Sequence, residues 1–100
     1  MGRFFVYILY SKHLDRFYTG VCTTSVEDRL EKHLGKNYSP KNFTRKADDW
    51  EIFWTLEGRT FSQVRKIEIH LKKMKSRRYF ENLKVFPEIG ERLLEKYQSF

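Results

Sequence analysis

The sequence predicts an α+β fold in which a small three-stranded antiparallel sheet is flanked by helices, in the order ββαβααα. Three short runs rich in aromatic and β-branched residues have the composition and length of strands. The first two runs are joined by the polar stretch SKHLDR, residues 11–16, which is typical of a hairpin loop. Four further stretches carry apolar residues at helical spacing, and helix-start residues precede them.

The strands are predicted over residues 3–10, 17–21 and 50–56. In the first strand, FFVYIL, every position is apolar or aromatic, and successive side chains of a strand point to opposite faces of the sheet. Both faces of this strand are therefore expected to be buried. Such a pattern indicates a central strand that helices cover on at least one side.

The first helix is predicted between the second and third strands. It begins at Thr24, which forms a capping box with Glu27, and it ends at Gly35. Its residues at helical spacing are Val26, Leu30, His33 and Leu34. Residues 36–49 contain Asn, Ser, Pro and basic side chains, and we expect them to form a loop.

Three more helices are predicted after the third strand. Thr60 and Gln63 form a second capping box at the start of the first of them. Its apolar stripe consists of Phe61, Val64, Ile67, Leu71 and Met74. Ser76 is expected to cap a short helix that ends near Leu83, and Pro87 suits the first turn of a final helix.

The composition predicts one domain with a hydrophobic core. The chain has 100 residues, of which 40% are hydrophobic, and residues 84–100 are expected to form a helical extension of the same domain. No apolar run reaches the roughly 20 residues that span a bilayer, so no membrane contact is expected. Cys22 has no second cysteine with which to form a disulfide, and no secretory signal is recognisable, which together predict a cytoplasmic protein.

The net charge of +7 is concentrated in one segment. Between Arg59 and Arg78, eight basic residues and one acid account for the whole excess, and residues 32–47 add five bases without an acid. A local excess of positive charge predicts a polyanionic partner, most often nucleic acid, although a solvated helix face is the alternative. The residues expected to contact nucleic acid are Lys32, Lys36, Lys41, Arg45, Lys46, Arg65, Lys72, Lys73 and Lys75.

Glu68 is the only acid in this basic segment, and it lies at the edge of its helix's apolar stripe, beside Ile67. One interpretation is an ion-pair partner that reduces repulsion between neighbouring bases. The other is a metal ligand, because magnesium prefers one or two carboxylates completed by water and substrate phosphate. The residues alone leave both interpretations open.

Arg29 is predicted on a flank of the first helix, one turn before His33. Ser25 and His33 occupy the positions one turn away, so no acid is placed to form a helix ion pair with Arg29. An arginine fork suits two oxygens of one phosphate. We therefore interpret Arg29 as a functional residue, with an ordinary exposed arginine as the alternative.

The order of these features resembles the GIY-YIG nuclease domain. The matching positions are F-V-Y at residues 5–7, Y-T-G at 18–20, Arg29, His33 and Glu68. The loop FTRKADDW and the segment E-x-x-L-K-K-x-K-S-R at residues 68–77 are similar to those of the small stand-alone bacterial members. The similarity covers about residues 4–83. The chain also resembles the N-terminal nuclease domain of the excinuclease subunit that makes incisions in DNA repair.

The resemblance implies an endonuclease that hydrolyses DNA phosphodiester bonds, acts in DNA repair or recombination, and uses one Mg²⁺ or Mn²⁺ ion. It implies that Tyr7 and Tyr18 lie on adjacent strands around one active site, with Tyr7 taking a proton from the attacking water. It also implies that Arg29 contacts the scissile phosphate, that His33 assists and that Glu68 holds the metal. Residues 1–83 would then form the nuclease domain.

Two other functions stay open at this stage. A nucleic-acid-binding module could keep the fold without the chemistry, and a protein-interaction domain could use the basic face to bind an acidic partner. The set of Tyr7, Tyr18, Arg29 and Glu68 favours catalysis, because a pure binder needs no lone acid in a phosphate-facing helix. RNA remains an alternative to DNA, and the sequence predicts no oligomeric state.

Overall fold

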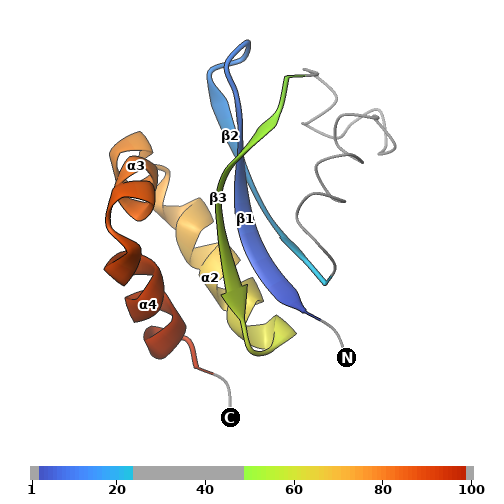
Figure 1. Cartoon of the computed structure of the whole chain (residues 1–100), viewed down its shortest axis with the longest axis vertical. Helices are drawn as coiled ribbons and strands as arrows, with labels where there is room; N and C mark the ends of the chain where they lie inside the picture. Colours follow the sequence, from blue (N-terminus) through green and yellow to red (C-terminus); the bar gives the residue numbers. More distant parts are fainter. Residues whose placement is uncertain (1–2, 24–48, 99–100) are drawn as a thin grey trace.

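The computed structural model describes residues 3–23 and 49–98, and it consists of a three-stranded sheet with helices packed on it (Figure 1). The strands are β1 (Phe4–Ser11), β2 (Arg16–Cys22) and β3 (Glu51–Gly58). The helices of the described part are α2 (Phe61–Met74), α3 (Arg77–Val85) and α4 (Pro87–Lys96). The predicted α+β fold is confirmed, whereas the helix predicted after Thr24 lies outside the described residues.

The strand order is β2-β1-β3, and both pairs are antiparallel. β1 is therefore the central strand, as its two apolar faces predict. In the hairpin, Tyr7 pairs with Gly20 and Leu9 pairs with Tyr18. Because directly paired residues share a face, this register places Tyr7, Leu9 and Tyr18 on one side of the sheet.

A β-bulge interrupts the pairing of β1 with β3. Ile8 pairs with Trp54 and Leu9 pairs with Ile52, which leaves Phe53 as the additional residue. Phe53 and Trp54 consequently pack against the same core cluster, although they are consecutive in the sequence. The bulge thus adds a second aromatic side chain to the face that the helices cover.

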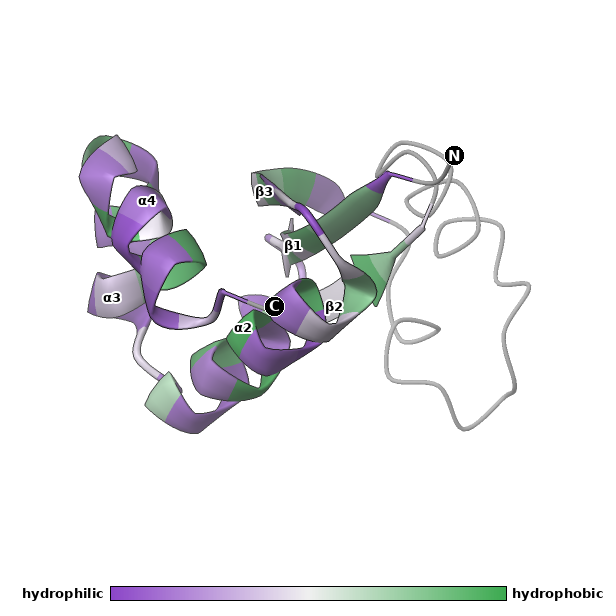
Figure 2. Ribbon diagram, turned by 90° about the horizontal axis from the view of Figure 1, so that it is seen from below, coloured by the Kyte–Doolittle hydropathy of each residue, from purple (hydrophilic) through white to green (hydrophobic). Residues whose placement is uncertain are grey.

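The main core lies between the sheet and α2. Val6 and Ile8 of β1 meet Val64, Ile67 and Leu71 of α2, and all five side chains are fully buried. Figure 2 shows α2, α3 and α4 together on this side of the sheet. We call it the helix face. Of the predicted apolar stripe of α2, Val64, Ile67 and Leu71 thus pack in the core as helical periodicity predicts. Phe61 and Met74, at the two ends of the helix, are exposed instead.

The start of α2 uses a variant of the predicted capping box. The Thr60 hydroxyl accepts from the Gln63 backbone N–H at 3.1 Å, which is the expected first bond. Gln63 Oε1 then accepts from the backbone N–H of Arg59 at 2.7 Å, one residue before the cap. Gln63 Nε2 donates to the carbonyl of Leu94 at 2.8 Å, so this buried side chain also ties α2 to α4.

The last two helices begin as predicted. The Ser76 hydroxyl accepts from the Tyr79 backbone N–H at 3.2 Å, and Pro87 occupies the first turn of α4. α4 packs closely on β3, because a Cβ at Gly90 would lie 3.2 Å from Leu56 Cδ1. Leu93 is buried in the main core, so α4 forms part of the same packed unit as the sheet. No helix within the described ranges has the length and apolarity needed to cross a bilayer.

Candidate active site

The side of the sheet opposite the helix face carries a second, smaller core cluster. Its buried members are Tyr7, Leu9, Cys22 and Trp50, with Tyr18 packed against them. We call it the tyrosine face. It differs from the helix face in chemistry, because a buried phenol combines a large apolar ring with a hydroxyl that needs a hydrogen-bond partner.

Tyr7 lies directly over Gly20, its partner in the hairpin register. A Cβ added at Gly20 would lie 2.6 Å from the Tyr7 hydroxyl oxygen and 3.2 Å from Tyr18 Cε1. Any residue other than glycine would therefore displace one of the two rings. The glycine of the Y-T-G segment thus has a physical role, since it lets the Tyr7 phenol cross β2.

The two tyrosines are close to each other. Their ring centroids lie 6.5 Å apart, with an angle of 36° between the ring planes. Tyr7 is fully buried, whereas Tyr18 is partly exposed. The two rings are therefore close enough to line one site, with Tyr18 nearer to solvent.

Glu68 is buried on α2, with a relative exposure of 5%. Its carboxylate forms ion pairs with Arg65 and with Lys72, whose Nζ lies 3.2 Å from Oε2. Both cationic side chains are about half exposed, so the carboxylate is the inner member of the cluster. The ion-pair interpretation of Glu68 is thus present in the structure.

Glu68 and the tyrosine pair approach the sheet from different sides. α2 packs on the helix face through the neighbouring Ile67, whereas the Tyr7 ring belongs to the tyrosine face. The two regions meet at β2, the edge strand of the sheet. There Tyr18 and Lys72 line the same cleft.

This cleft has a volume of about 450 Å³ and lies between the β1–β2 hairpin, the end of α2 and the start of α3. We call it the hairpin cleft. Its main lining residues are 15–19 together with Lys72, Lys75, Arg77 and Phe80. It therefore combines basic and aromatic side chains beside one of the two tyrosines.

The predicted nucleic-acid-binding residues fall into two groups. Arg65, Lys72, Lys73 and Lys75 are exposed on α2 or at its C-terminal end. The other predicted contacts, namely Lys32, Lys36, Lys41, Arg45 and Lys46, lie outside the described residues, as do Arg29 and His33. Of the five predicted catalytic positions, the structure thus describes Tyr7, Tyr18 and Glu68.

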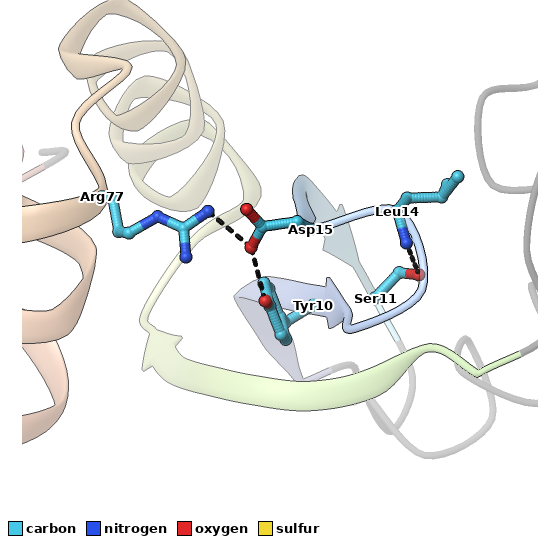
Figure 3. A network of polar contacts seen from close by, with 5 residues as sticks. All are labelled: Tyr10, Ser11, Leu14, Asp15 and Arg77. Carbon is cyan, nitrogen blue, oxygen red and sulfur yellow. Dashed lines mark hydrogen bonds and ion pairs between the residues drawn. The ribbon is translucent and has the colours of Figure 1, made fainter.

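A polar network that the sequence patterns did not predict fixes the hairpin to α3 (Figure 3). Asp15 Oδ1 accepts from the Tyr10 hydroxyl at 2.6 Å and from the Arg77 guanidinium at 2.6 Å. The Tyr10 hydrogen bond and the Arg77 guanidinium hold the pKa of the Asp15 carboxyl below its usual value. The hydrogen bond to Asp15 raises the pKa of Tyr10. No local pattern predicts this network, because Asp15 and Arg77 are 62 residues apart.

A second unpredicted network holds the start of β3. Asp49 accepts from the buried Ser11 hydroxyl at 2.6 Å and from the His13 backbone N–H at 2.8 Å. These two hydrogen bonds, that of Ser11 first, lower the pKa of Asp49. The hairpin that carries Tyr18 is therefore anchored at two points, by Asp15 and by Asp49.

The donor set for a metal ion is small. Within residues 3–23 and 49–98, no cluster of three or more His, Cys, Asp or Glu side chains is placed to bind a metal. Glu68 is a single buried carboxylate among cations. A single hard carboxylate fits a magnesium site of the kind that water and substrate phosphate complete.

A comparison with protein families gives one match. The family model described as the GIY-YIG catalytic domain matches residues 3–81. Neither the search of curated proteins nor the search of solved structures found a match. The matched range contains all three strands, α2 and the beginning of α3.

Proposed function

Because the chain belongs to the GIY-YIG catalytic domain family, whose members are generally nucleases, we propose that it is a divalent-metal-dependent endonuclease that hydrolyses phosphodiester bonds in DNA. The structural observation that supports the proposal is the pair of neighbouring phenols, with Tyr7 held over Gly20. Incision is a step of DNA repair and recombination, and we propose that the activity serves one of them in the cytoplasm.

In this proposal the Tyr7 phenol takes a proton from the attacking water, directly or through a hydrogen-bond network. The ordinary pKa of a tyrosine is about 10, so nearby positive charge must favour the phenolate. Tyr18 orients the water or a phosphate oxygen. Arg29 stabilises the charge that develops on the phosphate, with His33 assisting, and these two roles rest on the family resemblance alone.

Glu68 is the residue that we assign to the metal. Its buried carboxylate provides one hard oxygen donor, and Arg65 and Lys72 beside it provide cations for the phosphate. Bound Mg²⁺ or Mn²⁺ supplies Lewis acidity at the phosphoryl oxygen.

A nucleic-acid-binding module on the same fold is the second candidate function. One observation favours it: the carboxylate of Glu68 is already paired with two cations, on a helix that packs on the face opposite Tyr7. In that case Glu68 would stabilise α2 only. Arg65, Lys72 and Lys73, which are exposed on α2, would still bind phosphates.

The experiment that separates these candidates uses labelled duplex, single-stranded and branched DNA. We expect cleavage products with Mg²⁺ or Mn²⁺ and none with a chelator, whereas DNA binding persists in the chelator. A Tyr7→Phe protein purified in the same way controls for contaminating nucleases. Binding without cleavage on every substrate and with either metal would leave the binding module as the function.

A further inference from the structure

The hairpin cleft contains two unusual backbone conformations. Within the described ranges, the non-glycine residues with positive φ are Asp15, at 52°, and Lys75, at 46°. Both of them line this cleft. Left-handed backbone is unfavourable for residues with a Cβ, and such residues concentrate at ligand sites. Helices commonly end with glycine in this conformation, so a lysine at the end of α2 is an exception.

The hairpin cleft is lined by more basic than acidic side chains. Arg16, Lys72, Lys75 and Arg77 line it together with one carboxylate, that of Asp15. Lys72 pairs with Glu68 and Arg77 pairs with Asp15. Among the described side chains, Arg16 and Lys75 form no ion pair. Two cations are thus left for an external anion.

The inner wall of the cleft is aromatic. Phe17 and Phe80 meet edge to face, with ring centroids 5.2 Å apart, and both line the cleft. Phe80 is buried, whereas Phe17 is half-buried, with the Arg77 guanidinium 5.4 Å from its ring centroid. The volume of about 450 Å³ is that of a small-ligand site, for which roughly 300–1,000 Å³ is typical. Cations at the rim beside aromatic rings are the combination by which proteins bind single-stranded nucleic acid.

We propose that the hairpin cleft binds one unpaired nucleotide of a DNA strand, with Lys75 and Arg16 on its phosphate and the half-buried Phe17 against its base. Duplex DNA offers phosphates but keeps its bases stacked, so it occupies only the cationic rim. The inference rests on the proposed function, because it names unpaired nucleotides as the substrate feature that the nuclease recognises. Tyr18 lines the cleft and lies beside Tyr7, so the bound nucleotide would be next to the candidate active site.

The test measures the affinity of the full chain for a short fluorescent oligothymidylate and for a duplex of the same length, in chelator. The variants are Lys75→Gly and Lys75→Gln, with Lys66→Gln as a matched control. Lys66 is an exposed lysine of α2 that does not line the cleft. All three variants lose one positive charge, so general electrostatic attraction falls equally in each.

We expect both Lys75 variants to lose about tenfold in affinity for the single strand, which corresponds to one charge-assisted hydrogen bond. Lys66→Gln should lose less than about twofold. Lys75→Gly should melt no lower than the native protein, because glycine adopts the left-handed conformation freely. An equal loss of affinity in Lys75→Gln and Lys66→Gln would overturn the proposal.

Competition assays distinguish binding of a whole nucleotide from binding of its phosphate or its nucleoside alone. Thymidine monophosphate should displace the oligonucleotide at a lower concentration than inorganic phosphate or thymidine does, and it should do so less well from Lys75→Gln. Equal competition by inorganic phosphate would overturn the assignment of the base to the aromatic wall. None of these binding measurements requires cleavage. A protein that cleaves no DNA but shows the expected binding and competition would therefore refute the proposed nuclease activity and still support a nucleotide site in the hairpin cleft.

Discussion

Ile8 and Tyr7 are neighbours on β1 and both are fully buried, yet they contact different surroundings. Ile8 belongs to the aliphatic cluster under α2, whereas Tyr7 crosses Gly20 and lies beside Tyr18. The cluster around Ile8 contributes apolar burial, which stabilises the fold. The tyrosine face places a phenol at a buried position. Under the proposed function, two adjacent residues of β1 thus have different roles: Ile8 stabilises the fold and Tyr7 takes part in the chemistry.

Removal of the Tyr7 hydroxyl tests this division with the largest expected effect. Tyr7→Phe keeps the ring that fills the cluster but cannot transfer a proton. We expect cleavage to fall by about 100- to 10,000-fold, the usual contribution of a general base. Single-turnover cleavage of labelled DNA measures it. Near-native cleavage by the folded variant would mean that the tyrosine face is a second structural core.

Gly20 and Gly58 allow the same substitution to be compared next to Tyr7 and next to Val64 of the main core. A Cβ would lie 2.6 Å from the Tyr7 hydroxyl at Gly20 and 2.6 Å from Val64 Cγ1 at Gly58. Both neighbours are fully buried, so we expect Gly20→Ala and Gly58→Ala each to lower the free energy of unfolding by about 1–3 kcal/mol.

Only one variant of this pair should affect the chemistry. Gly20→Ala should also reduce cleavage by about 100-fold, because it displaces Tyr7. Gly58→Ala should leave the cleavage rate per folded molecule unchanged. Denaturant unfolding and single-turnover cleavage of both variants provide the comparison. Equal rates in the two variants would show that the position of Tyr7 does not matter.

Truncation of Ile8 should lower stability and leave cleavage unchanged, whereas Tyr7→Phe should lower cleavage. Ile8→Ala leaves a cavity between β1 and α2, and we expect a loss of about 2–5 kcal/mol in unfolding free energy. Cleavage per folded molecule should persist at a temperature where the variant is fully folded. A loss of activity without a loss of stability would break the division between the faces.

The smallest expected effect concerns pH. The pKa of Asp15 is lowered in the folded state, chiefly by the Tyr10 hydrogen bond and then by Arg77. A lowered folded pKa means that this stabilisation is present at neutral pH and is lost as pH falls through the folded pKa. We expect stability to decline below about pH 4, the ordinary range of a carboxyl. Asp15→Asn should flatten this decline in acid melting curves, and an unchanged slope would assign it to other groups, such as Asp49.

The strands and helix starts could be predicted from the sequence because they depend on local patterns. The alternation in β1 and the caps at Thr60 and Ser76 determine structure within a few residues. The proximity of Tyr7 and Tyr18 also follows from a short hairpin, which brings its two strands side by side.

The remaining features depend on contacts between distant segments. The bulge at Phe53 and the bond from Gln63 to Leu94 arise only when β3 and α4 pack in place. The pairing of Asp15 with Arg77 is similar, since both residues look like ordinary surface charges in the sequence. Glu68 shows the same limit, because neither the sequence nor its ion pairs decide between the two interpretations.

The most direct test of the central claim, that the chain is a nuclease and not only a binder, is a paired assay of Glu68→Gln. The substitution keeps the size of the side chain and removes the charge proposed to hold the metal. We expect cleavage to fall by orders of magnitude while DNA binding holds or tightens, because the basic surface loses one negative charge. As a structural ion-pair partner only, the buried Glu68 would affect stability, so Glu68→Gln would lower the melting temperature and leave cleavage per folded molecule unchanged. Native cleavage by a folded Glu68→Gln protein would contradict the metal assignment, and absence of metal-dependent cleavage by the native protein would favour the binding module.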